Sequence, residues 1–325
     1  MAETRFDVLG IGNALVDLLY DADDPWLARR GMVKGAMRLI DAAEAEALTA
    51  AGTPRRATSG GSAANTVVGV ASFGGRAAFV GRVRDDRVGS MFQDDLRRSG
   101  VTFDAEPARS GPPTGRCLIF VTPDGERTMN TFLGAAAEVG PAEVSEDLVA
   151  AADITYLEGY LFDPPAAQEA FRTAARLAHR AGRRVALTLS DRFCVDRHRR
   201  AFLDLVRGNV DLLFANESEI VALFGAPGFE EAAEAAGEAC ETAILTRGSL
   251  GAVVVHRGAA HRVPAVPVPA VIDTTGAGDL FAAGFLRGWT TGAGPEDSAR
   301  LGALAAAEII RQWGPRPERR LAELR

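Results

Sequence analysis

The residues best suited to chemistry stand together near the C-terminal end, where positions 271–285 read VIDTTGAGDLFAAGF. An apolar run, a glycine turn and helically spaced apolar residues follow one another, which predicts a strand, a tight turn and a helix. A helix entered through small residues presents its first backbone N–H groups and its positive dipole end to an anion. The turn residues Gly276, Ala277 and Gly278 are therefore candidates for an anion-binding site.

Asp279 falls in the first turn of the same predicted helix. A carboxylate repels a neighbouring anion, so its presence suggests a second task. It could remove a proton from a hydroxyl group while the N–H groups neutralise a transferring phosphoryl group. An acidic residue in a first helical turn also stabilises helices without any catalytic role. The segment alone leaves both interpretations open.

A second glycine-rich segment stands at residues 60–65, which read GGSAAN. Gly61 would let a ligand approach the backbone closely, and Asn65 would offer an amide to hydroxyl groups. The alternative is a plain helix cap, with Ser62 at the cap position.

Three more polar residues are candidates for binding. Asn216 and Glu219 follow an apolar strand with the spacing of a capping box, and the same pair could orient water around a magnesium ion. Asp17 lies beyond the first predicted strand, where a short carboxylate could accept hydrogen bonds from paired sugar hydroxyls. An ordinary surface aspartate is the alternative for Asp17.

Composition narrows the class of protein. The chain has 325 residues, 47% of them hydrophobic, and a net charge of −7, which fits a large α/β domain. No long basic run and no apolar run of about 18 residues occurs, so neither nucleic acid nor a membrane is expected as a partner. Three scattered cysteines indicate no disulfide framework or zinc site. No secretory signal is recognisable, so a cytoplasmic location is expected.

Strand-like and helix-like segments alternate along the chain, which predicts a largely parallel sheet with helices on both faces. Two β-like segments, residues 13–40 and 109–134, do not fit this alternation and are expected to pair into a small β lid. The residues at 314–317 indicate the end of the folded core. The expected strands are 6–12, 77–81, 154–157, 185–189, 210–214, 243–246 and 252–256, and the expected helices are 63–73, 91–99, 166–181, 199–207, 217–224, 230–240, 280–289 and 298–313.

Two nucleotide-binding motifs are absent or incomplete. Gly10 and Gly12 after the first strand resemble a dinucleotide fingerprint, but Leu15 stands where the third glycine is required. A hydride-transfer enzyme is therefore a distant alternative. The sequence contains no Walker-type phosphate loop, and its four histidines have no metal-site or catalytic-triad spacing.

With these motifs in this order, the chain resembles the ribokinase-like (PfkB-type) carbohydrate and nucleoside kinases over nearly its whole length. Two signatures carry the resemblance, residues 60–89 and residues 273–285. The resemblance implies one domain with a three-layer α/β/α fold, a mainly parallel central sheet and a small β lid. Adenosine and related nucleoside kinases are the most similar branch, through residues 12–17, 113–117 and 189–193.

The resemblance also implies roles in catalysis. Asp279 would deprotonate the 5′-hydroxyl of a nucleoside, and the turn at 276–278 would form the anion hole. ATP would be the phosphate donor with Mg²⁺ as cofactor, and a monovalent cation such as K⁺ stays open as an addition. Asn216 and Glu219 would hold Mg²⁺ through water. The residues implied on the ATP side are Asn216, Thr246, Gly248 and Gly251.

On the acceptor side the resemblance implies a ribose subsite and a nucleobase subsite. Arg127 would bind phosphate from the lid, while an aromatic face such as Phe193 would suit base stacking. Each base-pocket candidate has core packing as its alternative. The implied residues are Asn13, Asp17, Gly61, Ser62, Asn65, Cys117, Arg127, Leu133, Tyr160 and Phe193.

The sequence thus predicts an ATP- and magnesium-dependent nucleoside kinase that acts on a small molecule, adenosine first. A sugar kinase for ribose, fructose or a sugar phosphate is the first alternative. A non-catalytic nucleoside-binding regulator is the second, and the presence of Asp279 speaks against it. Two residues, Arg84 and Arg116, stand where related kinases carry small residues, which leaves the base preference open. A monomer or a homodimer formed through the lid is expected.

Overall fold

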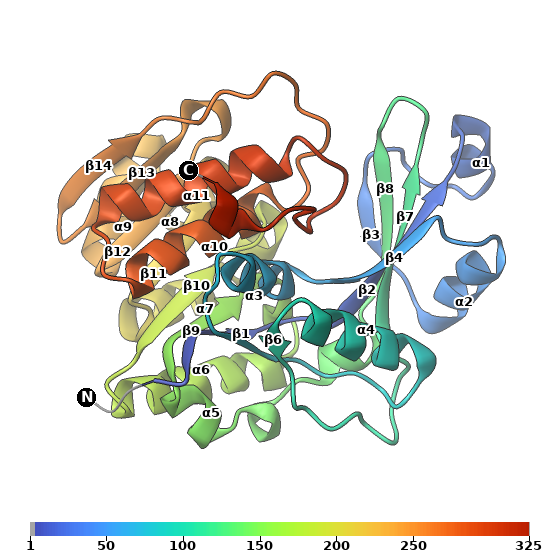
Figure 1. Ribbon diagram of the computed structural model, residues 1–325, viewed down its shortest axis with the longest axis horizontal. Coiled ribbons are helices and arrows are strands. Elements are labelled where there is room, and N and C mark those ends of the chain that lie inside the picture. Colours follow the sequence, from blue (N-terminus) through green and yellow to red (C-terminus); the bar gives the residue numbers. More distant parts are fainter. Residues whose placement is uncertain (1–3, 325) are drawn as a thin grey trace.

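The computed structural model describes residues 4–324 and is dominated by a nine-stranded sheet. Its strand order is β14-β13-β12-β11-β10-β9-β1-β5-β6 (Figure 1). Neighbouring strands are parallel except at β12–β13 and β13–β14, which are antiparallel. Helices lie on both faces of this sheet, so the predicted α/β class with a mainly parallel sheet is confirmed.

Most parallel strands are buried on both faces, as expected where each face is covered by helices. The strands are β1 (Phe6–Ile11), β5 (Ala77–Val80), β6 (Val101–Thr102), β9 (Ala152–Glu158), β10 (Arg184–Thr188), β11 (Leu212–Asn216), β12 (Thr242–Thr246), β13 (Ala252–His256) and β14 (Ala259–Val263). The helices are α3 (Ser62–Ser72), α4 (Arg87–Arg98), α5 (Glu146–Ala150), α6 (Pro165–Arg180), α7 (Arg192–Asn209), α8 (Glu217–Phe224), α9 (Phe229–Ala239), α10 (Ala277–Thr290) and α11 (Pro295–Ile309). Short 3-10 turns include η3 (Gly159–Phe162) and η4 (Gly248–Leu250).

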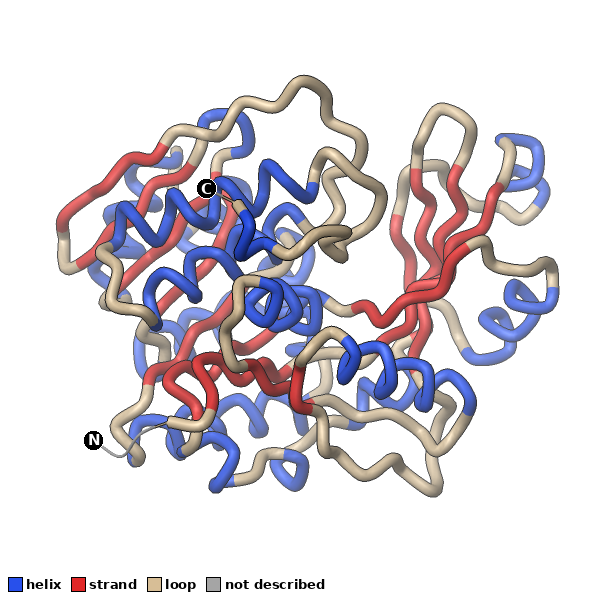
Figure 2. Tube along the Cα trace, viewed as in Figure 1, coloured by secondary structure: helices blue, strands red, loops and turns tan. Residues whose placement is uncertain are grey.

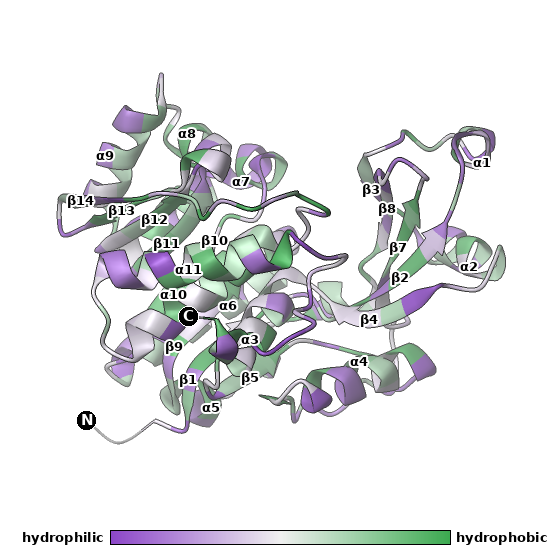
Figure 3. Cartoon of the chain, turned by 45° about the horizontal axis from the view of Figure 1, so that its top comes forward, coloured by the Kyte–Doolittle hydropathy of each residue, from purple (hydrophilic) through white to green (hydrophobic). Residues whose placement is uncertain are grey.

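Two apolar cores lie on opposite faces of the sheet, because successive strand side chains point to opposite sides. Along β1, Val8 packs in the core beneath α3, α10 and α11, while Leu9 and Ile11 pack in the core beneath α6 to α9. Figure 3 shows hydrophobic residues concentrated along the central strands and hydrophilic ones on the outer parts of α4 and α9. Glycine allows α10 and α11 to pack closely: a Cβ atom on Gly284 would lie 2.5 Å from the carbonyl oxygen of Leu301.

A second, five-stranded sheet stands to one side of the large sheet, with the order β3-β8-β7-β2-β4 (Figures 1 and 2). Helices α1 (Asp24–Arg29) and α2 (Ala42–Ala50) lie on its outer side. One strand, β4, comes from outside the two segments that the sequence assigned to the lid. The strands are β2 (Leu15–Asp21), β3 (Met37–Leu39), β4 (Arg56–Gly60), β7 (Gly115–Val121) and β8 (Arg127–Phe132).

An ion-pair cluster ties the loops at the far end of this small sheet. Lys34, which is the one lysine of the sequence, lies 2.8 Å from Asp24 and 2.6 Å from Asp124. The loop after α1 is thereby joined to the turn between β7 and β8.

The strand predicted immediately before the glycine turn is wrong. Residues 271–273 have no regular structure, and the side chains of Val271 and Ile272 are 57% and 45% exposed. The N–H group of Ile272 donates to the carbonyl of Ile310 instead of to a strand, at 2.8 Å. Three prolines between residues 264 and 269 cannot donate to a ladder, which explains why the sheet stops at β14.

The predicted end of the folded core at residues 314–317 is also wrong. Arg316 is 8% exposed and Leu321 is fully buried, because the chain runs back over α3 after α11. Within residues 4–324, no helix combines the length and apolar character needed to cross a membrane.

Candidate active site

A cleft of about 880 Å³ lies between the two sheets. Its floor is formed by residues at the carboxyl ends of the central parallel strands and by the first residues of α3 and α10. Its other wall is the inner face of the small sheet. Ligands of open α/β sheets bind at this edge, because the helix N-termini and the strand ends meet there.

The cleft brings together most of the residues that the sequence singled out. Of those candidates, Arg127 and Gly251 are absent from its lining. The predicted residues that do line it are Asn13, Asp17, Gly61, Ser62, Asn65, Cys117, Leu133, Tyr160, Phe193, Asn216, Glu219, Thr246, Gly248, Gly276, Ala277, Gly278 and Asp279.

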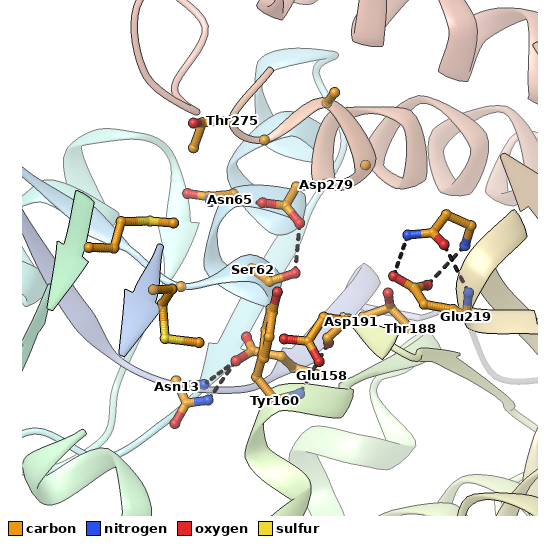
Figure 4. A pocket seen from close by; sticks show the side chains of 18 of the residues that line it. Asn13, Ser62, Asn65, Glu158, Tyr160, Thr188, Asp191, Glu219, Thr275 and Asp279 are labelled. Atoms are coloured by element: carbon orange, nitrogen blue, oxygen red, sulfur yellow. Dashed lines mark hydrogen bonds between the residues drawn. The ribbon is translucent and has the colours of Figure 1, made fainter. Parts of the chain in front are cut away.

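Asp279 is held between α10 and α3 by two hydrogen bonds. The hydroxyl of Ser62 donates to its Oδ1 at 2.6 Å, and the amide of Asn65 donates to its Oδ2 at 2.8 Å (Figure 4). Burial raises the pKa of the Asp279 carboxyl, and these two hydrogen bonds and the nearby Arg316 oppose that rise. The carboxylate thus faces the loop that would hold an acceptor hydroxyl, where a general base is needed.

The turn before α10 leaves backbone N–H groups available for an anion. Gly276 adopts a φ of 78°, and a Cβ atom there would lie 2.6 Å from Pro315, so only glycine suits this position. The N–H of Ala277 donates within the turn to Thr274 at 3.1 Å. Within residues 4–324, no protein acceptor contacts the N–H groups of Gly278 or Asp279, and no side chain caps α10.

Open space surrounds Gly278, since a Cβ atom built there would meet nothing within 4 Å. A phosphate oxygen can therefore approach the first turn of α10. The structure changes the predicted donor set: Ala277 uses its N–H group inside the turn, while the N–H groups of Gly278 and Asp279 stay available as donors for an anion hole.

Acceptor oxygens without partners line the side of the cleft where the sequence predicts a sugar. The side-chain carbonyls of Asn13 and Asn65 are buried and unpaired within the described part of the chain. Asp17 projects from β2 beside the β4 end, where a Cβ atom on Gly60 would be 2.4 Å from its Oδ1. Burial raises the pKa of Asp17 to about 6. Buried acceptors need donors, and sugar hydroxyls would supply them.

Glu158 is a site residue that the sequence did not identify. It lies fully buried at the carboxyl end of β9 and accepts hydrogen bonds from the backbone N–H of Asn13 and Ala63, at 3.3 and 2.8 Å. The Asn13 amide also donates to it at 2.7 Å. Burial raises the pKa of Glu158 to about 7. Its place directly after a predicted strand was a usable signal, because that edge binds ligands.

The small sheet contributes an apolar wall that was also missed. Met37 and Leu39 of β3 are 46% and 55% exposed and line the cleft, together with Leu15 and Met129. β3 has three residues, too few to show a period. On the large-sheet side, Phe193 is 74% exposed in the same cleft.

The predicted magnesium residues form a reciprocal capping box at the start of α8. The backbone N–H and side-chain amide of Asn216 donate to the two carboxylate oxygens of Glu219, at 2.9 and 2.6 Å (Figure 4). Burial raises the pKa of Glu219 to about 7. No group of three or more His, Cys, Asp or Glu side chains arranged to hold a metal occurs within residues 4–324. The capping interpretation is thus observed, and water-mediated contact of this pair with Mg²⁺ stays a prediction.

The two remaining predicted residues lie beside the cleft. Gly251 ends η4 with a φ of 91°, and a Cβ atom there would be 2.1 Å from the Val263 carbonyl. Arg127 of β8 bonds Asp273, and also the Thr275 hydroxyl at 2.8 Å. Two other nitrogens of Arg127, Nε and Nη2, are buried without partners in the described part of the chain. Donors of this kind suit a phosphate oxygen.

Comparison with known proteins decides the family. The model of the pfkB family carbohydrate kinases matches residues 33–319. The chain belongs to this family. It is therefore an ATP-dependent phosphotransferase, and the resemblance noted in the sequence is confirmed.

Two solved structures are similar over almost the whole chain. Adenosine kinase from Sinorhizobium meliloti is 51% identical with a TM-score of 0.91, and the match covers 98% of each chain. A "probable sugar kinase protein" from Rhizobium etli CFN 42 is 49% identical with a TM-score of 0.92, and the match covers 98% of this chain and 97% of that one. The ATP-dependent ribose-1-phosphate kinase of Halopiger xanaduensis is 32% identical over 73% of this chain and 75% of its own length.

Proposed function

We propose that this PfkB-family kinase transfers a phosphoryl group from ATP to the 5′-hydroxyl of a nucleoside, with adenosine as its preferred acceptor. The observation that carries the proposal is the change of character along the cleft. Buried polar acceptors near Asp279 suit a ribose, and the wall beyond them is apolar, with Met37 and Leu39 on the lid side and Phe193 on the other. A nucleoside has this same sequence of a hydroxylated ring followed by a flat base, whereas a free sugar has no apolar face of that size.

The 51% identical adenosine kinase supports this choice, because the match extends over both sheets and hence over both walls of the cleft. Purine nucleosides are proposed ahead of pyrimidine nucleosides on this similarity.

In the proposed reaction Asp279 accepts the proton of the 5′-hydroxyl group. The oxygen of that hydroxyl group attacks the transferring phosphoryl group at the same time. Ser62 and Asn65, which bond the carboxylate, keep it oriented. The N–H groups of Gly278 and Asp279 stabilise the charge that develops on the phosphoryl oxygens. Because the base and these donors belong to one helix turn, their relative geometry is set by the backbone.

On the ATP side of the cleft, polar and charged residues of the chain would likewise hold the phosphates. Arg127 would meet phosphate through its unpaired nitrogens, and Thr246 and Gly248 border the region for ATP. Asn216 and Glu219 would contact water molecules bound to Mg²⁺, whose chemical contribution when bound is to neutralise phosphate charge. The small sheet, acting as a lid, would exclude water that competes as phosphoryl acceptor.

A sugar kinase is the second candidate, and charged side chains in the cleft favour it. Arg38, Asp163, Asp191 and Arg197 also line the cavity and would suit a more polar acceptor. The 49% identical protein described as a probable sugar kinase belongs with this alternative.

The test is ADP release with ATP and Mg²⁺ against adenosine, guanosine, inosine, cytidine, ribose, fructose and fructose 6-phosphate, with Asp279→Asn as the control for contaminating kinases. Turnover of nucleosides, adenosine highest, that disappears in the variant is the expected result. Turnover of sugars alone would refute the nucleoside assignment and support the second candidate.

A further inference from the structure

The residues that follow α11 lie between the phosphate-binding turn and the acceptor-binding loop. The N–H of Gly314 donates to Oδ2 of Asp273 at 2.8 Å. Pro315 packs against Gly276, at the position where any Cβ atom would clash with it. The next residue, Arg316, is 8% exposed and bonds Ser59 and Ala64, on either side of the acceptor-binding loop. One short segment thus contacts both halves of the site.

The guanidinium of Arg316 bonds both ends of the acceptor-binding loop, residues 60–63. Its Nε and Nη2 donate to the carbonyl of Ser59, at 3.1 and 2.9 Å, and Nη2 also donates to the Ser59 hydroxyl at 2.9 Å. Its Nη1 donates to the carbonyl of Ala64 at 2.9 Å. Ser59 precedes the loop and Ala64 follows it, so one side chain spans the segment that carries Gly61 and Ser62.

This loop needs external support because of its own sequence. Gly61 adopts a φ of 96°, and a Cβ atom there would lie 2.1 Å from the Asn13 carbonyl. Paired glycines give a backbone many accessible conformations when nothing restrains it. The guanidinium of Arg316 restrains the residues on both sides of the two glycines, Ser59 and Ala64.

Arg316 also brings a buried positive charge close to the carboxylates of the site. Burial lowers the pKa of the guanidinium to about 10, so it stays charged at neutral pH. Its charge lowers the pKa of Asp17 and of Asp279, against the effect of their burial. The neutral variants of Arg316 should therefore have these carboxyls protonated at higher pH than the wild type.

We propose that Arg316 is a positioning residue for the phosphoryl acceptor, which holds residues 60–63 from both ends and joins them through Gly314 and Pro315 to the turn that begins α10. The proposal rests on phosphoryl transfer beside Asp279 but not on the identity of the acceptor.

The experiment compares Arg316→Met, Arg316→Lys and Ser59→Ala with Arg319→Met, a change of an exposed arginine of the same segment whose ion pair with Glu308 lies outside the cleft. We expect Arg316→Met to raise KM for the acceptor about tenfold or more, with kcat reduced as well, and to leave KM for ATP within about twofold. Ser59→Ala should raise KM for the acceptor severalfold, and Arg319→Met should change neither constant.

The pH profile of kcat/KM separates a positioning role from a purely structural one. In Arg316→Met the acid limb should move up by about half a pH unit, whereas Arg316→Lys, which keeps the charge, should keep the wild-type limb and still show a raised acceptor KM. All the variants leave in place the other charged and titratable groups that face these carboxylates, namely Cys117, Arg127, Tyr156, Glu158 and Tyr160, and also Asp95, which faces Arg316.

Wild-type kinetics and an unmoved acid limb in Arg316→Met would overturn the proposal, and so would a lower melting temperature as its sole defect. If Arg316→Met does not fold, the acceptor KM of Arg316→Lys and Ser59→Ala decides in the same way. If the wild type phosphorylates a sugar and not a nucleoside, the proposed function fails while this test proceeds with that sugar. If no acceptor in the panel is turned over, calorimetric affinity for adenosine and ribose replaces KM.

Discussion

The two ends of the cleft are built in different ways. At the phosphate end, Asp279 is half-buried with both carboxylate oxygens bonded, and Gly276 could carry no side chain without a clash. At the far end, Phe193 is 74% exposed, and Leu39, 55% exposed, lines the opposite wall. The first region is fixed by hydrogen bonds and tight contacts, and the second offers apolar surface with few restraints.

This difference separates the two tasks of the enzyme. A network of polar groups in fixed positions pre-organises its charges for one chemical step. Such a network tolerates few substitutions. Exposed apolar side chains discriminate among acceptors by contact area, and such discrimination is modest for each side chain. Substitutions at the two ends should therefore differ in size and in the kinetic constant that they alter.

The largest effect is expected at the phosphate end from Asp279→Asn. Losing the general base should lower kcat by about two to three orders of magnitude or more, with acceptor binding largely kept. Steady-state ADP release measures it, and Asp297→Asn, at an exposed position on α11, is the matched control. Near-normal turnover in Asp279→Asn would exclude Asp279 as the base.

The next effect is the response of the wild type to acid. Because burial raises the pKa of Asp17 to about 6 and that of Glu158 to about 7, both carboxylates take up protons between neutral pH and pH 5. Each protonation removes acceptor capacity for hydrogen bonds, so kcat/KM for the acceptor should fall about tenfold per unit below these values. A profile that stays flat down to pH 5 would contradict this assignment.

A smaller loss of activity is expected for Glu158→Gln. Glutamine keeps the shape of the side chain but turns an NH₂ group toward the N–H donors of Asn13 and Ala63. The mispaired donors should displace the loop at Asn13 and the start of α3 and lower kcat/KM about tenfold, mainly through KM for the acceptor. Glu296→Gln, on an exposed turn of α11, is the control. The variant should also lose the part of the acid limb near pH 7, and an unchanged limb would show that Glu158 does not contribute.

The smallest effect on kinetics is expected from a substitution at the far end of the cleft. Phe193→Ala should raise KM for adenosine about two- to tenfold without changing kcat, since one aromatic contact is lost. Val33→Ala, equally exposed but outside the cleft, should have no effect. An effect of Phe193→Ala that is equal for adenosine and ribose would place the base elsewhere.

The sequence predicted the large sheet and its helices well, because buried parallel strands and amphipathic helices have strong periods in the chain. It also placed Asp279 and the glycine turn at the start of a helix, because the local backbone of such a turn requires small residues. What it missed depends on tertiary contacts. The exposure of Met37 on the small sheet and the burial of Arg316 follow from the packing of distant segments.

Two errors have the same origin. Residues 271–273 look like a strand locally, but they pair with no strand within residues 4–324, and Ile272 and Asp273 bond Ile310 instead. Glu158 directly follows the predicted strand 154–157, and its contacts with Asn13 and Ala63 form only when the segments after β1 and β4 converge on it.

The single lysine gives this protein a built-in chemical handle. Lys34 is held between Asp24 and Asp124 at the outer end of the small sheet, far in the sequence from the catalytic turn. These carboxylates raise its pKa, so amine-reactive reagents should modify it slowly at neutral pH and faster under alkaline conditions. A fluorophore coupled to this side chain would test whether the small sheet moves when a ligand binds, without the introduction of a new residue.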